Sequence, residues 1–245
     1  MRIKAANLTT TEKNIEWRSH EPSRIETFSD AVFAFAVTLI IVSLEVPKSY
    51  TELFEVMKGT FSFAACFATL FIIWNSQNIF FRRYGLTDPW TIILNGILLF
   101  VVLIYAYPLK FLFSLLFTNN SYLLNGQVHE MITTYQNSDF MIIYGTGFTA
   151  INFLFYLLYS NAKKYANEIK LNKKEIYYTQ TVRYINLIST FIGVGAILIA
   201  MLLPVENAGE SGFFYFTIPL AYIAWFIYRG KRSIKIFKAN ELMPS

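Results

Sequence analysis

The sequence predicts an all-α integral membrane protein with six transmembrane helices. Hydrophobic residues make up 55% of the 245 residues and charged residues only 15%, whereas a soluble domain carries about 25% charged residues. The mean hydropathy is +0.41. The apolar residues gather in long runs of about 20 residues, which is the length that a helix needs to cross a bilayer. These runs do not alternate with polar residues, so no strand pattern competes with the helices.

Six apolar runs are long enough to be transmembrane helices. The first follows a polar N-terminal region, and the second and third are long enough to tilt in the membrane. Pro108 and Lys110 indicate that the third bends or approaches the membrane interface there. Residues 1–245 are therefore expected to form one membrane domain with polar tails over 1–22 and 229–245. The predicted spans are 28–46, 53–81, 90–117, 140–159, 177–203 and 213–228.

The distribution of basic residues predicts the orientation. Of the 21 Lys and Arg residues, 18 lie before the first span, between the second and third, around the connection of the fourth and fifth, or after the sixth. Only Lys48, Lys58 and Lys110 belong to the opposite side. Since basic residues accumulate in cytoplasmic connections, both tails are expected in the cytoplasm and the protein in the plasma membrane.

Other function classes find no support in the sequence. The basic residues are spread over short connections, which fits a lipid bilayer as partner and not a nucleic acid. His20 and His129 are isolated and form no metal site with cysteines or carboxylates. The chain has no glycine-rich phosphate loop and no paired carboxylates. We therefore expect no enzyme activity, no cofactor and no soluble substrate.

The first span begins with an ionisable motif, Arg24-Ile-Glu-Thr-Phe-Ser-Asp30. Pro22 is expected in the first turn of this helix, with Ser19 or Glu21 near the cap. Arg24 and Asp30 point about 120° apart on a helix, so they cannot readily pair with each other. Each needs a partner on another helix, because an unpaired charge in a membrane is costly.

The second and third spans offer such partners. Trp74 and Asn78 share one helix face, Asn75 and Gln77 lie beside them, and Asn95 lies one turn into the third span. Asn and Trp donate hydrogen bonds to a carboxylate. One interpretation is a polar clamp that fixes helix packing. The other is that Asp30 binds a proton or an ion.

A second stripe on the first helix suggests a pore. One helix cannot enclose a pore, but copies related by rotational symmetry can. Thr38 would then give a ring of hydroxyls at mid-membrane, and its alternative role is a hydrogen bond to its own helix. Asp30 lies outside this stripe, whose members fall within about 80° of one another. They are Ala31, Phe35, Thr38, Val42 and Glu45.

These residues resemble a known family. Arg24-x-x-x-Phe28-Ser29-Asp30 at the start of the first of six helices is similar to the signature of the transmembrane protein 175 family of potassium channels. Trp74 with Asn78 four residues later also resembles the pattern of that family. Asn95 and Pro108 do so too. A chain with one six-helix repeat resembles the prokaryotic type.

The resemblance implies a homotetramer whose first helices line the central pore. It implies an apolar constriction at Phe35, where the family usually has Ile or Leu. Val42, farther along the same stripe, is expected to belong to the constriction as well. Thr38 is implied to contribute to cation selectivity, with potassium near it. Glu45 would form an acidic ring at the outer pore mouth, which attracts cations.

The sequence thus predicts a potassium-selective channel that conducts passively, with Phe35 as a hydrophobic gate and modest selectivity at Thr38. In this interpretation the polar network of Arg24, Phe28, Ser29, Asp30, Trp74, Asn78 and Asn95 positions the pore helix. One alternative is a proton leak or a proton-coupled cation carrier that uses Asp30. Another is a scaffold or sensor that does not conduct.

Overall fold

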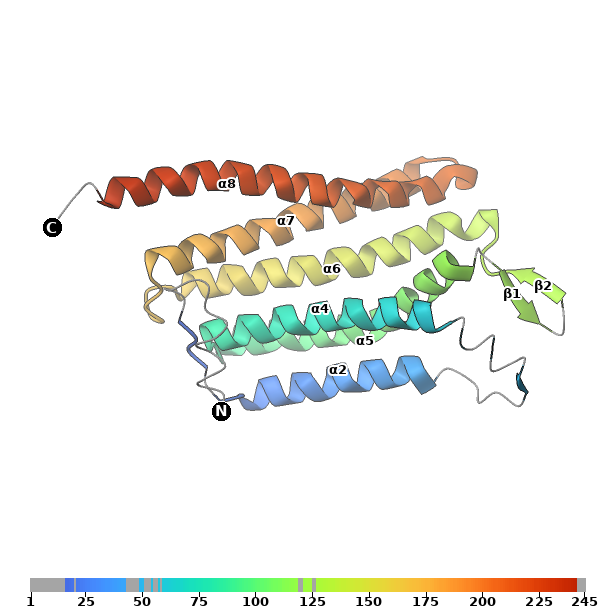
Figure 1. The fold of residues 1–245 in the computed structure, drawn as a ribbon, viewed down its shortest axis with the longest axis horizontal. Coiled ribbons are helices and arrows are strands. Elements are labelled where there is room, and N and C mark those ends of the chain that lie inside the picture. Colours follow the sequence, from blue (N-terminus) through green and yellow to red (C-terminus); the bar gives the residue numbers. More distant parts are fainter. Residues whose placement is uncertain are drawn as a thin grey trace.

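In the part of the chain that the structure describes, six long α-helices occur. They lie side by side, and successive helices run in opposite directions (Figure 1). The computed structural model describes residues 16–19, 21–42, 49–50, 54, 57, 59–118, 121–124 and 127–241. The helices are α2 (Arg24–Val42), α4 (Thr60–Tyr84), α5 (Pro89–Thr118), α6 (Asn137–Lys164), α7 (Lys173–Leu202) and α8 (Thr217–Glu241). The last five are long and apolar enough to cross a membrane, while α2 has 19 residues.

Capping residues explain several helix ends. Gly85 ends α4 in the left-handed conformation, with φ 59°, which a residue without Cβ adopts at little cost. Asn172 and Glu175 form a reciprocal capping box at the start of α7, each side chain accepting from the backbone N–H of the other. Asp88 caps α5 by accepting from the Thr91 backbone N–H at 3.2 Å, directly before Pro89.

Two regions differ from the sequence expectation. The connection after α5 contains a short antiparallel hairpin, β1 (Ser121–Leu124) with β2 (Gln127–Glu130), although no strands were predicted. Strands of four residues are too short to give a clear period-two signal. A 3₁₀ turn, η1 (Thr134–Gln136), then leads into α6.

The last helix also differs from its predicted span. A 3₁₀ segment, η2 (Val205–Phe216), precedes α8, which begins at Thr217 instead of residue 213. Pro219 then lies in the first turn of α8, where its missing N–H is tolerated. The helix continues to Glu241, so most of the predicted tail 229–245 prolongs α8.

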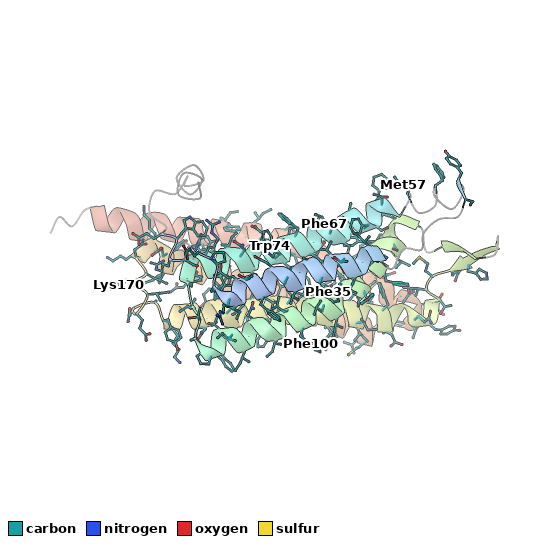
Figure 2. All side chains as sticks on the ribbon, turned by 90° about the horizontal axis from the view of Figure 1, so that it is seen from below. Phe35, Met57, Phe67, Trp74, Phe100 and Lys170 are labelled. Carbon is teal, nitrogen blue, oxygen red and sulfur yellow. The ribbon has the colours of Figure 1, made fainter. Side chains whose placement is uncertain are left out.

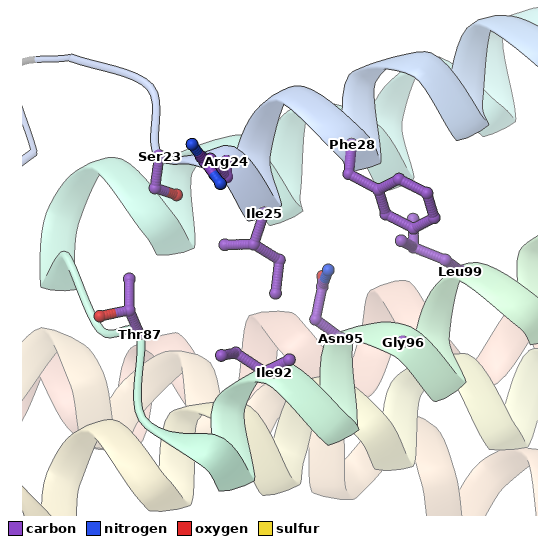
Figure 3. A pocket seen from close by; sticks show the side chains of 9 residues that line it. All are labelled: Ser23, Arg24, Ile25, Phe28, Thr87, Ile92, Asn95, Gly96 and Leu99. Carbon is purple, nitrogen blue, oxygen red and sulfur yellow. The ribbon is translucent and has the colours of Figure 1, made fainter.

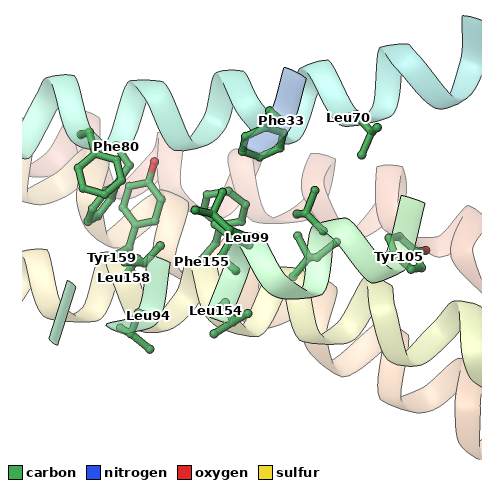
Figure 4. Close-up of a cluster of buried hydrophobic side chains, with 14 of the residues drawn as sticks. Phe33, Leu70, Phe80, Leu94, Leu99, Tyr105, Leu154, Phe155, Leu158 and Tyr159 are labelled. Atoms are coloured by element: carbon green, nitrogen blue, oxygen red, sulfur yellow. The ribbon is translucent and has the colours of Figure 1, made fainter. Parts of the chain in front are cut away.

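The core lies between α2, α4, α5 and α6. Helix α5 packs against α2, α4 and α6, whereas α8 packs on α7 and η2 at the opposite edge of the bundle (Figure 1). Phe80 of α4 contacts Tyr159 of α6 edge to face, with ring centroids 5.3 Å apart (Figure 4). Helix α2 therefore lies at one edge of the packed bundle, where it contacts α4 and α5.

Candidate pore helix and its polar anchors

Helix α2 has one buried face and one exposed face. Phe33, Ala36 and Ile40 recur at helical spacing and are at most 4% exposed. On the other face Phe35 is 56% exposed, and Thr38 is exposed as well. Figure 2, viewed from the α2 edge of the bundle, shows Phe35 on this outer helix. Within this single chain, the middle of the exposed face is apolar apart from Thr38.

Thr38 combines the two roles considered for it. Its hydroxyl donates a 2.8 Å hydrogen bond to the carbonyl oxygen of Ala34 in the same helix. This bond uses the hydroxyl proton and leaves the oxygen lone pairs, which accept hydrogen bonds or contact a cation. The back-bond therefore fixes the Thr38 side chain with its oxygen on the exposed face of α2.

A buried chain of amides and a hydroxyl holds the Arg24 end of α2. Gln77 of α4 donates to the Asn95 side-chain oxygen at 2.9 Å, and the Asn95 amide donates to Ser29 Oγ at 3.0 Å. Ser29 in turn donates to the Ile25 carbonyl at 2.7 Å. These three polar side chains are at most 1% exposed. These hydrogen bonds connect α4, α5 and α2, and each of the three buried polar side chains has a hydrogen-bond partner.

Asp30 has a partner of its own on α4. Trp74 donates its indole N–H to Asp30 Oδ1 at 2.7 Å. The Trp74 ring also contacts Phe71, with centroids 5.3 Å apart, and this contact orients the indole. Asp30 itself is exposed in the single chain. Its bond to Trp74 therefore joins α2 to α4 at the edge of the buried face of α2, not at the centre of that face.

The start of α2 is capped by Ser23, not by Ser19 or Glu21 as predicted. Glu26 accepts from the Ser23 backbone N–H at 2.9 Å, and the Glu26 backbone N–H donates to Ser23 Oγ at 3.4 Å. This is a capping box, and Pro22 therefore precedes the helix. The Ser-x-x-Glu pattern from Ser23 to Glu26 was the sequence signal for it.

Residues 16–19, before this cap, tie α2 to the rest of the bundle. Arg18 forms an ion pair with Glu175 of α7 at 2.8 Å and donates to the Ile169 carbonyl at 2.8 Å. The hydrogen bond to Glu175 raises the pKa of Arg18, although burial opposes the shift. The Arg82 guanidinium lies over the Trp17 ring at 4.4 Å. The chain leading into α2 is thereby fixed to the ends of α4 and α7.

A shallow hollow separates the first turns of α2 from α5 (Figure 3). It has a volume of about 410 Å³, and Arg24, Phe28, Asn95 and Gly96 are among the residues that line it. A methyl group added at Gly96 would meet no other atom within 4 Å. Three residues of the predicted network, Arg24, Phe28 and Asn95, thus border an open and mainly apolar hollow.

A basic residue of α5 contacts the backbone at the Val42 end of α2. Lys110 of α5 donates from Nζ to the carbonyl oxygen of Ile40 at 3.0 Å. The last carbonyls of a helix lack partners within the helix, and a cation there is favourable. The sequence placed Lys110 near the interface but did not predict this bond. The Val42 side chain and Glu45 lie outside the described residues.

The structure brings most of the predicted network together. Ser29, Asp30, Trp74 and Asn95 make the bonds given above. Neither Arg24 nor Asn78 makes a side-chain hydrogen bond within the described part of the chain, so their place in the network stays a prediction. Gln77 and Lys110 were not selected as site residues. A glutamine and a lysine within otherwise apolar helices were the signals for them.

Comparison with known proteins places the chain in a family. The family model described as endosomal/lysosomal potassium channel TMEM175 matches residues 24–108. A protein of Marivirga tractuosa named potassium channel is 38% identical over 216 residues, which cover 83% of this chain and 85% of that protein. The chain belongs to the TMEM175 family. A potassium channel of Chamaesiphon minutus is 30% identical over 96 residues, covering 36% of this TMEM175 chain and 47% of that protein.

A solved structure supports the same assignment. The crystal structure of the T38A variant of the potassium channel MtTMEM175, in complex with a nanobody–MBP fusion protein, is similar to this TMEM175 chain with a TM-score of 0.76. The identity is 35%, and the match covers 91% of this chain and 98% of that one. The chain is thus an all-α, multi-pass membrane protein of a channel family, and not an enzyme.

Proposed function

We propose that this chain is one subunit of a homotetrameric potassium channel of the plasma membrane, in which four copies of α2 line a central pore. The observation that carries the proposal is the exposed face of α2, where Thr38 stands among apolar side chains. The opposite face is packed and tied by hydrogen bonds to α4 and α5. Relatives named potassium channels support potassium as the permeant ion.

The exposed face supplies a gate and a selectivity element in this proposal. Four copies of Phe35, with Val42 beyond them, form an apolar constriction that blocks ions when water leaves it. Thr38 oxygens replace part of the water around a potassium ion held beside them. Hydroxyls on one ring select only modestly, because they do not build the stacked carbonyl sites of a dedicated filter. Glu45 raises the local cation concentration at the outer mouth.

The polar contacts give the proposal its rigid frame. The bonds of Ser29, Asp30, Trp74 and Asn95 set the rotation of α2, and this rotation decides which face points to the pore axis. Arg24, Phe28 and Asn78 complete the frame in this proposal, with a neighbouring subunit covering the hollow of Figure 3. Both termini lie in the cytoplasm, as the distribution of Lys and Arg predicts.

The test is the reversal potential of the purified protein in planar bilayers, with potassium on one side and sodium on the other. Thr38→Ala is expected to reduce potassium selectivity at least severalfold while current persists. Thr146→Ala is the matched control, because Thr146 is also exposed and donates the same bond within its helix, to the Ile142 carbonyl at 2.7 Å. An unchanged selectivity in Thr38→Ala contradicts the role of Thr38, and a silent wild type contradicts the channel itself.

A proton pathway through Asp30 is the second candidate, because Asp30 is exposed and accepts its bond from Trp74 alone among the described residues. Proton flux into liposomes distinguishes the two. A carrier or proton leak loses its proton flux in Asp30→Asn, whereas a potassium channel retains its potassium current in every correctly assembled Asp30→Asn tetramer.

A further inference from the structure

A long groove runs along the bundle, and no residue of α2 lines it. Most of its lining residues belong to α4, α6 and α7, and Tyr105 and Leu109 of α5 and Tyr222 of α8 complete it. Its volume is about 430 Å³. On α6 it extends from Tyr144 to Tyr159, a rise of about 22 Å, so it follows most of the thickness of the hydrocarbon core.

The wall of the groove is apolar in character. No Asp, Glu, Lys, Arg or His is among its lining residues, which include Ile72, Ile151 and Phe155. Asn152 and Asn186, which also line it, donate their amides to carbonyls of their own helices at 2.9 Å. The Tyr105 hydroxyl, which also lines the groove, has no hydrogen-bond partner within the described part of the chain. Because the wall carries no charge and its amide donors are satisfied, it suits a hydrocarbon chain better than a polar solute.

A basic residue, Arg83, lies next to one end of the groove but is not among its lining residues. Tyr178 lines this end, and the Arg83 guanidinium stacks on its ring at 3.6 Å. Arg83 is only 7% exposed, yet its Nε and Nη1 have no hydrogen-bond partner within the described part of the chain. No carboxylate of the described residues pairs with Arg83, since Glu175 is taken by Arg18. A buried guanidinium with two unmet donors is costly unless an anion accepts from it.

We propose that the groove binds an anionic phospholipid, with one acyl chain along the wall and the phosphate accepting from Arg83. The apolar wall accounts for the chain, and the unmet donors of Arg83 account for the negative charge. Arg83 is the next-to-last residue of α4, at the depth where headgroups lie when α4 crosses the membrane. The lipid belongs to the leaflet at the Arg24 end of α2.

The test is native mass spectrometry of the purified full chain, titrated with dioleoylphosphatidylglycerol or dioleoylphosphatidylcholine. The wild type is expected to bind phosphatidylglycerol about tenfold more tightly. Arg83→Gln should lose this preference and Arg83→Lys should keep most of it. Arg82→Gln, next to it on α4 and stacked on Trp17, is the matched control and should behave as wild type. Equal binding of the two lipids by the wild type, or a preference that survives in Arg83→Gln, overturns the proposal.

A second pair of measurements covers the case in which Arg83→Gln does not fold. Ser76→Trp fills the groove from α4 and should lower the binding of both lipids, while the wild-type elution volume is kept. Ser76→Cys in a Cys66→Ala background tests whether another subunit covers the groove. An intersubunit disulfide through residue 76 means that protein occupies the groove, and this result also overturns the proposal.

Discussion

The two ends of α2 are held in different ways. At the Arg24 end, Ser29 and Asp30 are bonded to side chains of α4 and α5, and the capping box and residues 16–19 add further ties. At the Val42 end, Lys110 donates to one backbone carbonyl. The difference indicates that one end of the proposed pore helix is anchored by side chains specific to its sequence. At the other end, the bond from Lys110 goes to a backbone carbonyl, which any residue at position 40 would present.

The largest effect is expected from breaking the buried chain at the Arg24 end. Asn95→Ala removes the acceptor of the buried Gln77 amide and the donor to Ser29, which keeps its own bond to the Ile25 carbonyl. A loss of about 1.5–4.5 kcal/mol in the free energy of unfolding follows, taking about 1–3 kcal/mol for the unsatisfied Gln77 amide and about 0.5–1.5 kcal/mol for the lost bond to Ser29. Unfolding in mixed detergent micelles measures it. Asn75→Ala, at an exposed position of α4, is the control. An equal loss of unfolding free energy in this variant would contradict the stabilising role of the buried hydrogen bonds.

A smaller loss is expected at the Val42 end. Lys110→Met removes one charge-assisted bond, worth at most about 1.5–3 kcal/mol, and also removes the cost of a charge inside the membrane. Lys110→Arg keeps a donor and should stay close to wild type. The same unfolding measurement decides the comparison. If Lys110→Met destabilises the protein as much as Asn95→Ala, the two ends are held equally and the contrast is wrong.

The next smaller loss of stability is expected from removing the hydrogen bond between Trp74 and Asp30. Trp74→Phe keeps an aromatic ring against Phe71 but removes the donor to Asp30, so about 0.5–1.5 kcal/mol should be lost. Trp225→Phe is a matched control, because the buried Trp225 indole N–H has no hydrogen-bond partner among the described residues, so that its removal breaks no bond among those residues. Equal losses in the two variants would mean that Trp74 acts through its size alone.

Acid should weaken the bundle slightly near the Arg24 end of α2. Burial disfavours the charge of Asp88, but hydrogen bonds from Thr91 and Asn161 outweigh it and lower the pKa of Asp88. A lowered pKa in the folded state gives stability that is present above the usual Asp value of about 3.9 and is lost as the pH falls below it. Thermal midpoints at pH 6 and pH 3.5 should therefore differ more in the wild type than in Asp88→Asn.

The sequence predicted the helices better than their connections. Long apolar runs locate spans because every backbone group in a membrane must be bonded within its own helix. The hairpin at Ser121–Glu130 and the 3₁₀ segment before Thr217 depend on turn geometry over a few residues. Such short elements give only a weak periodic signal in the sequence. For the site, the sequence indicated Ser29, Asp30, Trp74 and Asn95 as a polar clamp because polar side chains inside a membrane need partners.

By itself the sequence determined the number of helices, the apolar stripe with Thr38, and the polar residues in need of partners. Only the tertiary structure decided how those residues pair. Gln77 to Asn95, Asn95 to Ser29, and Lys110 to Ile40 depend on how α2, α4 and α5 are rotated and shifted against one another. A transmembrane span can be located from a single stretch of sequence, because it depends on the length of an apolar run. A hydrogen bond between helices is set by packing over their whole contact surface, which no single segment encodes.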